Sequence, residues 1–347
     1  MKASFLATTT YAGEAPGGMA AWPVAPSYCD RQVASDTMVR TLETCALAED
    51  LGFDWISLSE HHYAPFMMTP NPVVMAGALS QVVKRCRIAL LGPLLPLANP
   101  IRVAEEIAML DSLSGGRVVV LFLRGTPNEH RTYGDVGANS RSMTQEGIEL
   151  ILKAWTSETP FAWDGEHFQF QNVAVWPRTL QDPHPPVYGS GNSEESVVFA
   201  ARNRLGVGMS FAGPALLKRW IDLYLAEAEK AGWTPTRGHV LYRGNAHVAE
   251  SDDAAHRDVG AGRGETEFGP GYRVPTPDLN NPLAYITRPY FLGSPKTVIE
   301  QARVLHDCGV GVIDMAFTTA MGRVDYQGQQ AVMELFAKEV LPEIRAW

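Results

Sequence analysis

Two patterns of apolar residues alternate along the chain. Short runs rich in Val, Ile and Leu are typical of strands that are buried on both faces of a parallel sheet. Between them lie longer segments whose apolar residues recur every three or four positions, the pattern of a helix with one buried face. The predicted strands are residues 2–9, 53–59, 87–92, 118–123, 185–189, 206–211, 239–249 and 310–317, and the predicted helices are residues 36–51, 72–85, 100–114, 143–155, 193–203, 214–231, 294–309 and 327–341.

These segments form eight alternations of strand and helix, and they predict an α/β protein with the fold of a (β/α)8 TIM barrel, built as one domain over residues 1–347. An open, doubly wound sheet is the alternative, because it also alternates strands and helices. It is disfavoured because no GxGxxG pattern follows a predicted strand.

Residues suited to helix capping stand at several predicted boundaries. Asp36 is the expected N-cap of the first helix, Asn71 precedes the proline that opens the second, and Ser294 precedes Pro295 in the same way. Gly115 follows the third helix and predicts its end.

Three stretches interrupt the repeat and are read as insertions, at about residues 10–35, 156–184 and 260–292. The second contains FAWDGEHFQF, which predicts a hairpin that turns at Asp164-Gly165. The first and third are rich in Gly and Pro and follow predicted strands, so they are candidate lids over the catalytic face; ordinary surface loops are the alternative.

Composition and charge narrow the possible partners. The chain carries 38 acidic and 29 basic residues, a net charge of −9, and no run of Lys or Arg, so nucleic acid is not an expected partner. The apolar runs are of strand length, which argues against a membrane span, and MKASFLATTT is too poor in apolar residues for a signal peptide. The four cysteines are widely spaced, which indicates free thiols and a cytoplasmic location.

The predicted second strand ends in Ser59-Glu60-His61-His62, at the end of the barrel where catalytic residues gather. Adjacent histidines point in different directions, so at most one faces the cavity, where an imidazole can exchange a proton near neutral pH. A hydrogen-bonded structural histidine is the alternative. No metal is expected, because His61, His62 and Glu60 lack a further clustered ligand in the sequence.

Two further strand ends predict an anion site. Arg124 and Gly125 follow the fourth strand, where a guanidinium can bind a phosphate through two hydrogen bonds. A turn of small residues follows the fifth strand and leads into a helix whose N-terminal N–H groups attract anions. Consecutive barrel strands are neighbours, so both groups predict one site for a phosphorylated cofactor; a salt-bridged arginine and ordinary helix capping are the alternatives. The turn comprises Gly189, Ser190, Gly191, Asn192 and Ser193, with Ser196 one turn into the helix.

Five segments together resemble the bacterial luciferase-like flavin monooxygenases. They are SEHHYAPFMMTPNP at 59–72, LLPLANPIRVAEEIAMLDSLSGGR at 94–117, LRGTPNEHRTYG at 123–134, HPPVYGSGNSEES at 184–196 and FLGSPKTVIEQ at 291–301. The resemblance implies that FMN is the cofactor and that Arg124, Asn192, Ser193 and Ser196 hold its phosphate. It places His61 beside the flavin ring as the catalytic residue, with Glu60 of the same motif at the cofactor. It also implies a non-proline cis peptide near Leu91-Gly92, forming a wall of the flavin site.

The resemblance implies a two-component monooxygenase in which reduced FMN (FMNH2), supplied by a separate flavin reductase, reacts with O2 and oxygenates a small apolar organic substrate through a flavin peroxide. A homodimer is a further expectation from the family. Leu123 replaces a cysteine of the luciferases and Asn192 replaces an acidic residue, so a long-chain aldehyde substrate is not implied. The alternatives are a deazaflavin-dependent hydride-transfer enzyme of the same superfamily and a non-catalytic flavin-binding partner subunit. Loop aromatics such as Tyr11 and Phe291 indicate an apolar substrate or packing.

Overall fold

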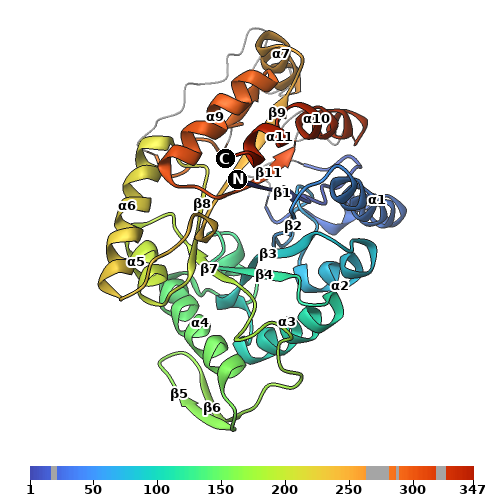
Figure 1. The fold of residues 1–347 in the computed structure, drawn as a ribbon. Coiled ribbons are helices and arrows are strands. Elements are labelled where there is room, and N and C mark those ends of the chain that lie inside the picture. The colour runs from blue at the N-terminus through green and yellow to red at the C-terminus, as the bar shows by residue number, and fades with distance from the viewer. Residues whose placement is uncertain (17–21, 263–280, 287–288, 318–325) are drawn as a thin grey trace.

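The computed structural model describes residues 1–16, 22–262, 281–286, 289–317 and 326–347. Eight parallel strands form a closed barrel in the order β9-β11-β1-β2-β3-β4-β7-β8, and the pairing of β8 with β9 closes it. Helices surround this barrel (Figure 1). The predicted TIM barrel is therefore confirmed, and the open doubly wound sheet is excluded.

The barrel strands coincide with the predicted runs to within a few residues. They are β1 Lys2–Leu6, β2 Trp55–Leu58, β3 Arg87–Leu94, β4 Val118–Leu123, β7 Val187–Ser190, β8 Gly206–Ser210, β9 Val240–Val248 and β11 Val312–Phe317. The short strand β10, Phe291–Gly293, pairs with β9 outside the closed ring. The helices are α1 Arg31–Asp50, α2 Pro72–Val82, α3 Pro100–Ser114, α4 Ser140–Thr156, α5 Glu194–Arg202, α6 Pro214–Lys230, α7 Asp252–Gly262, α9 Pro295–Cys308, α10 Tyr326–Glu339 and α11 Leu341–Arg345.

Helix α1 begins earlier than predicted. Asp30, not Asp36, is its N-cap, because the Asp30 carboxylate accepts the backbone N–H groups of Gln32 and Val33. Asp36 lies inside the helix and accepts a hydrogen bond from the Gln32 side chain. The weak apolar stripe of the first turn concealed this start. The predicted caps Asn71 and Ser294 are confirmed.

The predicted hairpin is confirmed within the second insertion, but its turn is residues 165–168 and not Asp164-Gly165, because Asp164 is the last residue of β5 and pairs with Gln169. Strands β5 (Phe161–Asp164) and β6 (Gln169–Val173) pair antiparallel, and the Gly165 N–H donates to the Phe168 carbonyl at 3.0 Å to close the turn. Most of the third insertion, residues 263–280 and 287–288, lies outside the described residues, as do residues 17–21 of the first. The lid role of these two insertions stays a prediction.

The barrel interior changes from apolar to polar along the strands. Near the N-terminal ends of the strands, a separate apolar cluster fills the barrel with side chains such as Trp55, Tyr188 and Leu241. Alternate residues of a strand share a face, so Arg243 follows Leu241 on the inner side of β9. The inner polar residues therefore lie toward the C-terminal mouth, where sites in this fold are found.

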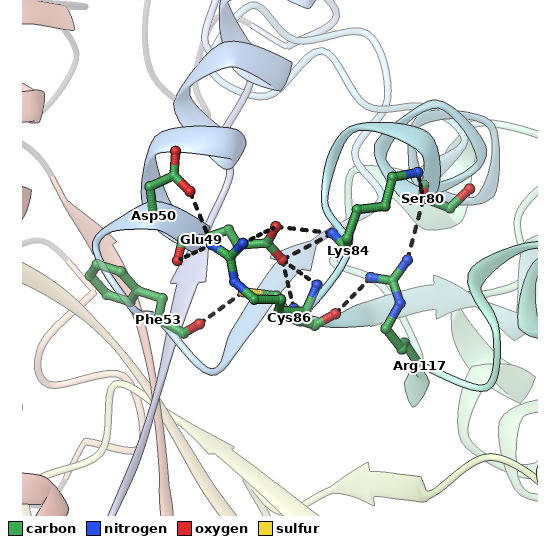
Figure 2. A network of polar contacts seen from close by, with 8 residues as sticks. Glu49, Asp50, Phe53, Ser80, Lys84, Cys86 and Arg117 are labelled. Carbon is green, nitrogen blue, oxygen red and sulfur yellow. Dashed lines mark hydrogen bonds and ion pairs between the residues drawn. The ribbon is translucent and has the colours of Figure 1, made fainter.

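A buried carboxylate ties α1 to the segment between α2 and β3, as Figure 2 shows. The Glu49 side chain accepts the backbone N–H groups of Lys84, Arg85 and Cys86 at 2.6–3.0 Å. Burial raises the pKa of Glu49, but these three donors more than offset it and hold the pKa below its usual value. Glu49 therefore stabilises the fold as a carboxylate.

We expect Glu49→Gln to lower the free energy of unfolding at pH 7 by about 2 kcal/mol, because an uncharged amide cannot accept all three hydrogen bonds equally. Because the pKa of Glu49 is lowered by folding, its stabilisation is complete above the unfolded-state value of 4.5 and is lost as pH falls from there through the folded-state value. The difference between wild type and variant should therefore be smaller at pH 4 than at pH 7. Urea unfolding at pH 7 and at pH 4 measures this. Asp50→Asn, at a 76% exposed neighbour, is the control and should change stability by less than about 0.5 kcal/mol. An equal loss in both variants would contradict the role of Glu49.

Candidate functional site

The two histidines after β2 point in different directions. The ring of His62 is buried, and its Nε2 lies 3.0 Å from Oε1 of Glu60. The other Glu60 oxygen accepts the backbone N–H of Leu94 at 3.1 Å. Glu60 and His62 thus join the end of β2 to the end of β3, and both Glu60 oxygens contact protein groups. A contact of Glu60 with a cofactor stays a prediction.

His61 faces a carboxylate that sequence reasoning missed. Its Nδ1 lies 2.6 Å from Oε1 of Glu129, and the His61 side chain is 23% exposed while that of Glu129 is 5% exposed. Glu129 follows Arg124 by five positions, in the β4–α4 loop, and its Oε2 accepts the Thr126 N–H at 2.8 Å. The acidic residue in the TPNEHR segment was the available signal, but it had no visible partner in the sequence.

Glu129 fixes the hydrogen-bonding role of His61. Burial raises the pKa of Glu129. The net pKa is nevertheless lower than usual, because the carboxylate is stabilised by the hydrogen bond and charge of His61 and by the hydrogen-bond donors of Thr126. A carboxylate only accepts hydrogen bonds, so Nδ1 of His61 must donate. The remaining Nε2 of a neutral ring then carries a lone pair that can accept a proton from a ligand.

Two arginines, Arg124 just after β4 and Arg141 in the first turn of α4, are close enough for their charges to interact. Burial lowers the pKa of Arg124, the Arg141 guanidinium lowers it further, and Glu195 acts in the opposite direction. Arg141 donates to Ser193 Oγ at 3.3 Å and forms an ion pair with Glu195. Within the described part of the chain, the Arg124 guanidinium forms no hydrogen bond or ion pair. Two adjacent guanidinium groups repel each other, so this arrangement favours a bound anion.

The backbone around Arg124 is held in place by its own loop. The Arg124 carbonyl lies 3.0 Å from Nε2 of His130. Gly125 has a φ of +84°, a left-handed conformation that strongly favours glycine, and a Cβ there would lie 3.2 Å from the Leu94 side chain. Arg124 is therefore directed by a tight turn at the end of β4.

The small-residue turn after β7 divides into two parts. Ser193 caps α5 and its hydroxyl lies 2.9 Å from that of Ser196, so these two predicted residues lie beside Arg141. The Asn192 amide instead exchanges two hydrogen bonds with the backbone of Ser210. The Gly191 N–H donates to the Gly208 carbonyl at 2.7 Å. Asn192 and Gly191 therefore join β7 to β8, with Gly189 and Ser190 inside the strand, and cofactor contacts of these four residues stay predictions.

A non-proline cis peptide joins Leu91 to Gly92 in β3, where the resemblance implied one. A Cβ at Gly92 would lie 1.7 Å from the Leu121 carbonyl oxygen, so no other residue fits there without movement of β4. The Ser59 hydroxyl donates to the Leu91 carbonyl. The end of β2 and the bend of β3 thus form one continuous wall at the mouth.

The described part of the first loop is tied to the segment that follows β2. Trp22 donates from its indole to the His62 carbonyl at 2.8 Å, and the Tyr11 N–H donates to the Pro65 carbonyl at the same distance. Tyr11 is buried, and Phe291 belongs to the main core against Tyr242. Phe291 is therefore a packing residue and carries no information about the substrate.

Comparison with known proteins identifies the family of the chain. The family model of the luciferase-like monooxygenases matches residues 16–311, and the chain belongs to that family. The alkanal monooxygenase alpha chain of Photorhabdus laumondii is 30% identical over 57% of the chain and 55% of its own length. The oxygenase component of the flavin-dependent trigonelline monooxygenase of Acinetobacter baylyi is 24% identical over 90% of this chain and 91% of its own length. The chain spans about half the length of the first curated relatives it matches.

Solved structures share the fold. The monooxygenase RslO1 of Streptomyces bottropensis superposes with a TM-score of 0.78, 24% identity and 99% coverage of both chains. The oxygenating constituent of 3,6-diketocamphane monooxygenase of Pseudomonas putida, in complex with FMN, superposes with a TM-score of 0.74 and 21% identity. The match covers 99% of this chain and 98% of that one. Within the described ranges, no helix is long and apolar enough to cross a membrane, and no cluster of three metal-ligating side chains occurs.

Proposed function

We propose that the protein is the oxygenase of a two-component system and binds FMN at the mouth of the barrel. The observation that carries this proposal is the meeting of Arg124 and Arg141 beside Ser193 at the start of α5. Two guanidinium groups and a helix N-terminus form a site suited to a phosphate dianion. The His61–Glu129 pair stands at the same mouth, and its β4–α4 loop also carries Arg124.

In this proposal each group has a distinct task. Arg124, Arg141, Ser193 and Ser196 hold the phosphate, and the cis peptide at Leu91-Gly92 lies against the ring. His61, oriented by Glu129, holds or moves a proton at its Nε2. When bound, reduced FMN supplies the electrons that activate O2. Loops over the mouth exclude water from the reacting atoms.

The names of relatives support the finer parts of the proposal. One relative is the oxygenase component of a flavin-dependent monooxygenase, which favours a separate flavin reductase as the transient partner. A solved structure of the same fold contains FMN. O2 and a small, mainly apolar organic molecule are the proposed substrates.

The direct test is binding and reaction with defined cofactors. The purified chain should bind FMN, and its complex with reduced FMN should consume O2 without another protein. Deazaflavin F420 is the comparison ligand, because an F420-dependent secondary alcohol dehydrogenase has the same fold. Tight binding of F420 without binding of FMN would overturn the proposal in favour of hydride transfer. Binding of FMN without any reaction of its reduced form with O2 would favour a non-catalytic subunit.

We also propose a homodimer through the outer faces of α2 and α3. These neighbouring helices expose apolar side chains, with Val74 at 72%, Met109 at 53% and Leu113 at 59% exposure. Met109 and Leu113 are one helical turn apart and share a face. Leu180 is 59% exposed and lies near Gly116, at the end of α3.

We expect Met109→Glu/Leu113→Glu to convert the dimer to a monomer, because buried carboxylates across a symmetric interface would be unpaired. Sedimentation velocity measures the mass. Val304→Glu, at a 44% exposed position of α9, is the control and should leave the dimer intact. A wild-type chain that sediments as a monomer at micromolar concentration would contradict the proposal.

A further inference from the structure

A buried arginine lies inside the barrel, directly below the mouth. Arg243 stands on the inner side of β9 with its side chain 11% exposed. Its Nε donates to Asp314 Oδ2 at 2.7 Å, and its Nη1 donates to Ser59 Oγ at 2.7 Å. The other Asp314 oxygen accepts the Ser57 hydroxyl at 2.6 Å. The guanidinium is therefore fixed in orientation by two direct partners, Asp314 of β11 and Ser59 just after β2, and Ser57 in turn holds the Asp314 carboxylate.

One donor of this guanidinium is left over. Nη2 of Arg243 is buried and has no hydrogen-bond partner among the residues that the structure describes. Buried donors are almost always satisfied, and an unsatisfied one costs free energy. A buried ion pair is itself weak evidence for stability. A rigidly held donor with no protein partner points to a ligand.

The position of Arg243 connects it to the wall at Leu91-Gly92. The Ser59 hydroxyl that accepts from Arg243 donates to the Leu91 carbonyl, which belongs to the cis peptide. Arg243 is therefore two hydrogen bonds from the surface against which the proposed flavin ring lies. It is also distinct from the arginines of the proposed phosphate site, Arg124 just after β4 and Arg141 in the first turn of α4.

The charges around Arg243 favour a ligand whose hydrogen-bond acceptor is neutral in one redox state and gains negative charge on reduction. Asp314 already neutralises Arg243, and Glu129 and Glu60 are further carboxylates at this part of the mouth. A ligand carboxylate here would face three acidic groups with no spare cation. An oxidised flavin ring is neutral, and two-electron reduction adds two electrons and one proton, which leaves negative charge shared by N1 and the C2 carbonyl at neutral pH.

We propose that Nη2 of Arg243 donates a hydrogen bond to the pyrimidine edge of the flavin ring, at N1 or the C2 carbonyl, and thereby favours binding of the reduced cofactor. This inference rests on the proposed FMN site. It assigns the buried Arg243–Asp314 pair a part in selecting the redox state of the cofactor. A two-component oxygenase requires such a preference, because it must take up reduced flavin and release oxidised flavin.

Anaerobic titrations with oxidised FMN and with dithionite-reduced FMN test the inference. Arg243→Lys keeps the charge beside Asp314 but has no second nitrogen. We expect Arg243→Lys to weaken the binding of reduced FMN about tenfold more than the binding of oxidised FMN. For a two-electron couple this is equivalent to a fall of about 30 mV in the reduction potential of the bound flavin. The double variant Arg243→Gln/Asp314→Asn keeps a neutral, hydrogen-bonded pair and should show the same selective loss, which guards against misfolding of the single variant.

Arg117→Lys is the matched control, because Arg117 is also partly buried and donates to the carbonyls of Ser80, Cys86 and Ser114, away from the mouth. It should leave the affinities for both redox states unchanged. Equal affinity changes for oxidised and reduced FMN, or none, in the folded Arg243 variants would overturn the inference while the FMN site stands. A wild-type protein that binds FMN in neither state would overturn the proposed function itself.

Discussion

Replacing Arg124 with alanine is expected to weaken the binding of FMN about a hundredfold while leaving the binding of riboflavin unchanged. The guanidinium is partly buried, has no partner in the described part of the chain and stands beside Arg141, so it is available for a phosphate. Charge-assisted hydrogen bonds contribute roughly 1.5–3 kcal/mol each, and a guanidinium can form two to one phosphate. Quenching of flavin fluorescence measures both affinities.

Riboflavin is the internal control, because it carries the ring without the phosphate. Arg141→Ala should show the same selective loss, smaller because Arg141 is also paired with Glu195. Arg102→Ala, which removes a surface guanidinium paired with Glu106 on α3, should change neither affinity. Equal losses for FMN and riboflavin would show that Arg124 supports the loop and not a phosphate.

Most of the fold could be predicted because the barrel repeats one local pattern. Each strand is a short apolar run, and the caps Asn71, Ser294 and Gly115 mark helix ends in the sequence. The exception, the start of α1 at Asp30, lies where the apolar periodicity is weak. Strand order then follows from the closure of consecutive neighbours, which the register of β1 with β2 and with β11 confirms.

The candidate site was predictable only where its residues lie at strand ends. His61, Arg124 and Ser193 each follow a strand, so the fold itself places them at one mouth. Glu129, Arg141 and Asp314 act through partners far away in sequence, with separations of 68 residues for His61–Glu129 and 71 for Arg243–Asp314. No local pattern reveals such pairs, since they depend on side-chain directions that barrel closure determines.

These distant pairs give several charged groups at the mouth a partner of opposite charge. Asp314 neutralises Arg243, Glu129 orients His61, and Glu195 offsets Arg141. Among the described residues, Arg124 is a cation at this mouth without a partner, and Nη2 of Arg243 is one of several buried polar groups without one. An anionic phosphate and a ring that becomes anionic on reduction match these two groups.

The largest kinetic effect is expected for His61→Ala. General acid–base groups contribute roughly a hundredfold to ten-thousandfold to rates, so the reaction of O2 with the complex of reduced FMN should slow at least about a hundredfold. Stopped-flow absorbance measures the return of oxidised flavin after mixing with O2. FMN affinity should be unchanged.

Glu129→Gln separates orientation of the ring from its chemistry. The amide can still accept from Nδ1 of His61 and keep the ring oriented, but the negative charge beside the ring is lost, so the rate should fall less than in His61→Ala. His62→Gln is the matched control from the same motif, because the His62 ring turns away toward Glu60. A His61→Ala variant with the rate of the wild type would remove His61 from the chemistry. A rate that falls in His62→Gln as far as in His61→Ala would assign the proton to the pair of His62 and Glu60.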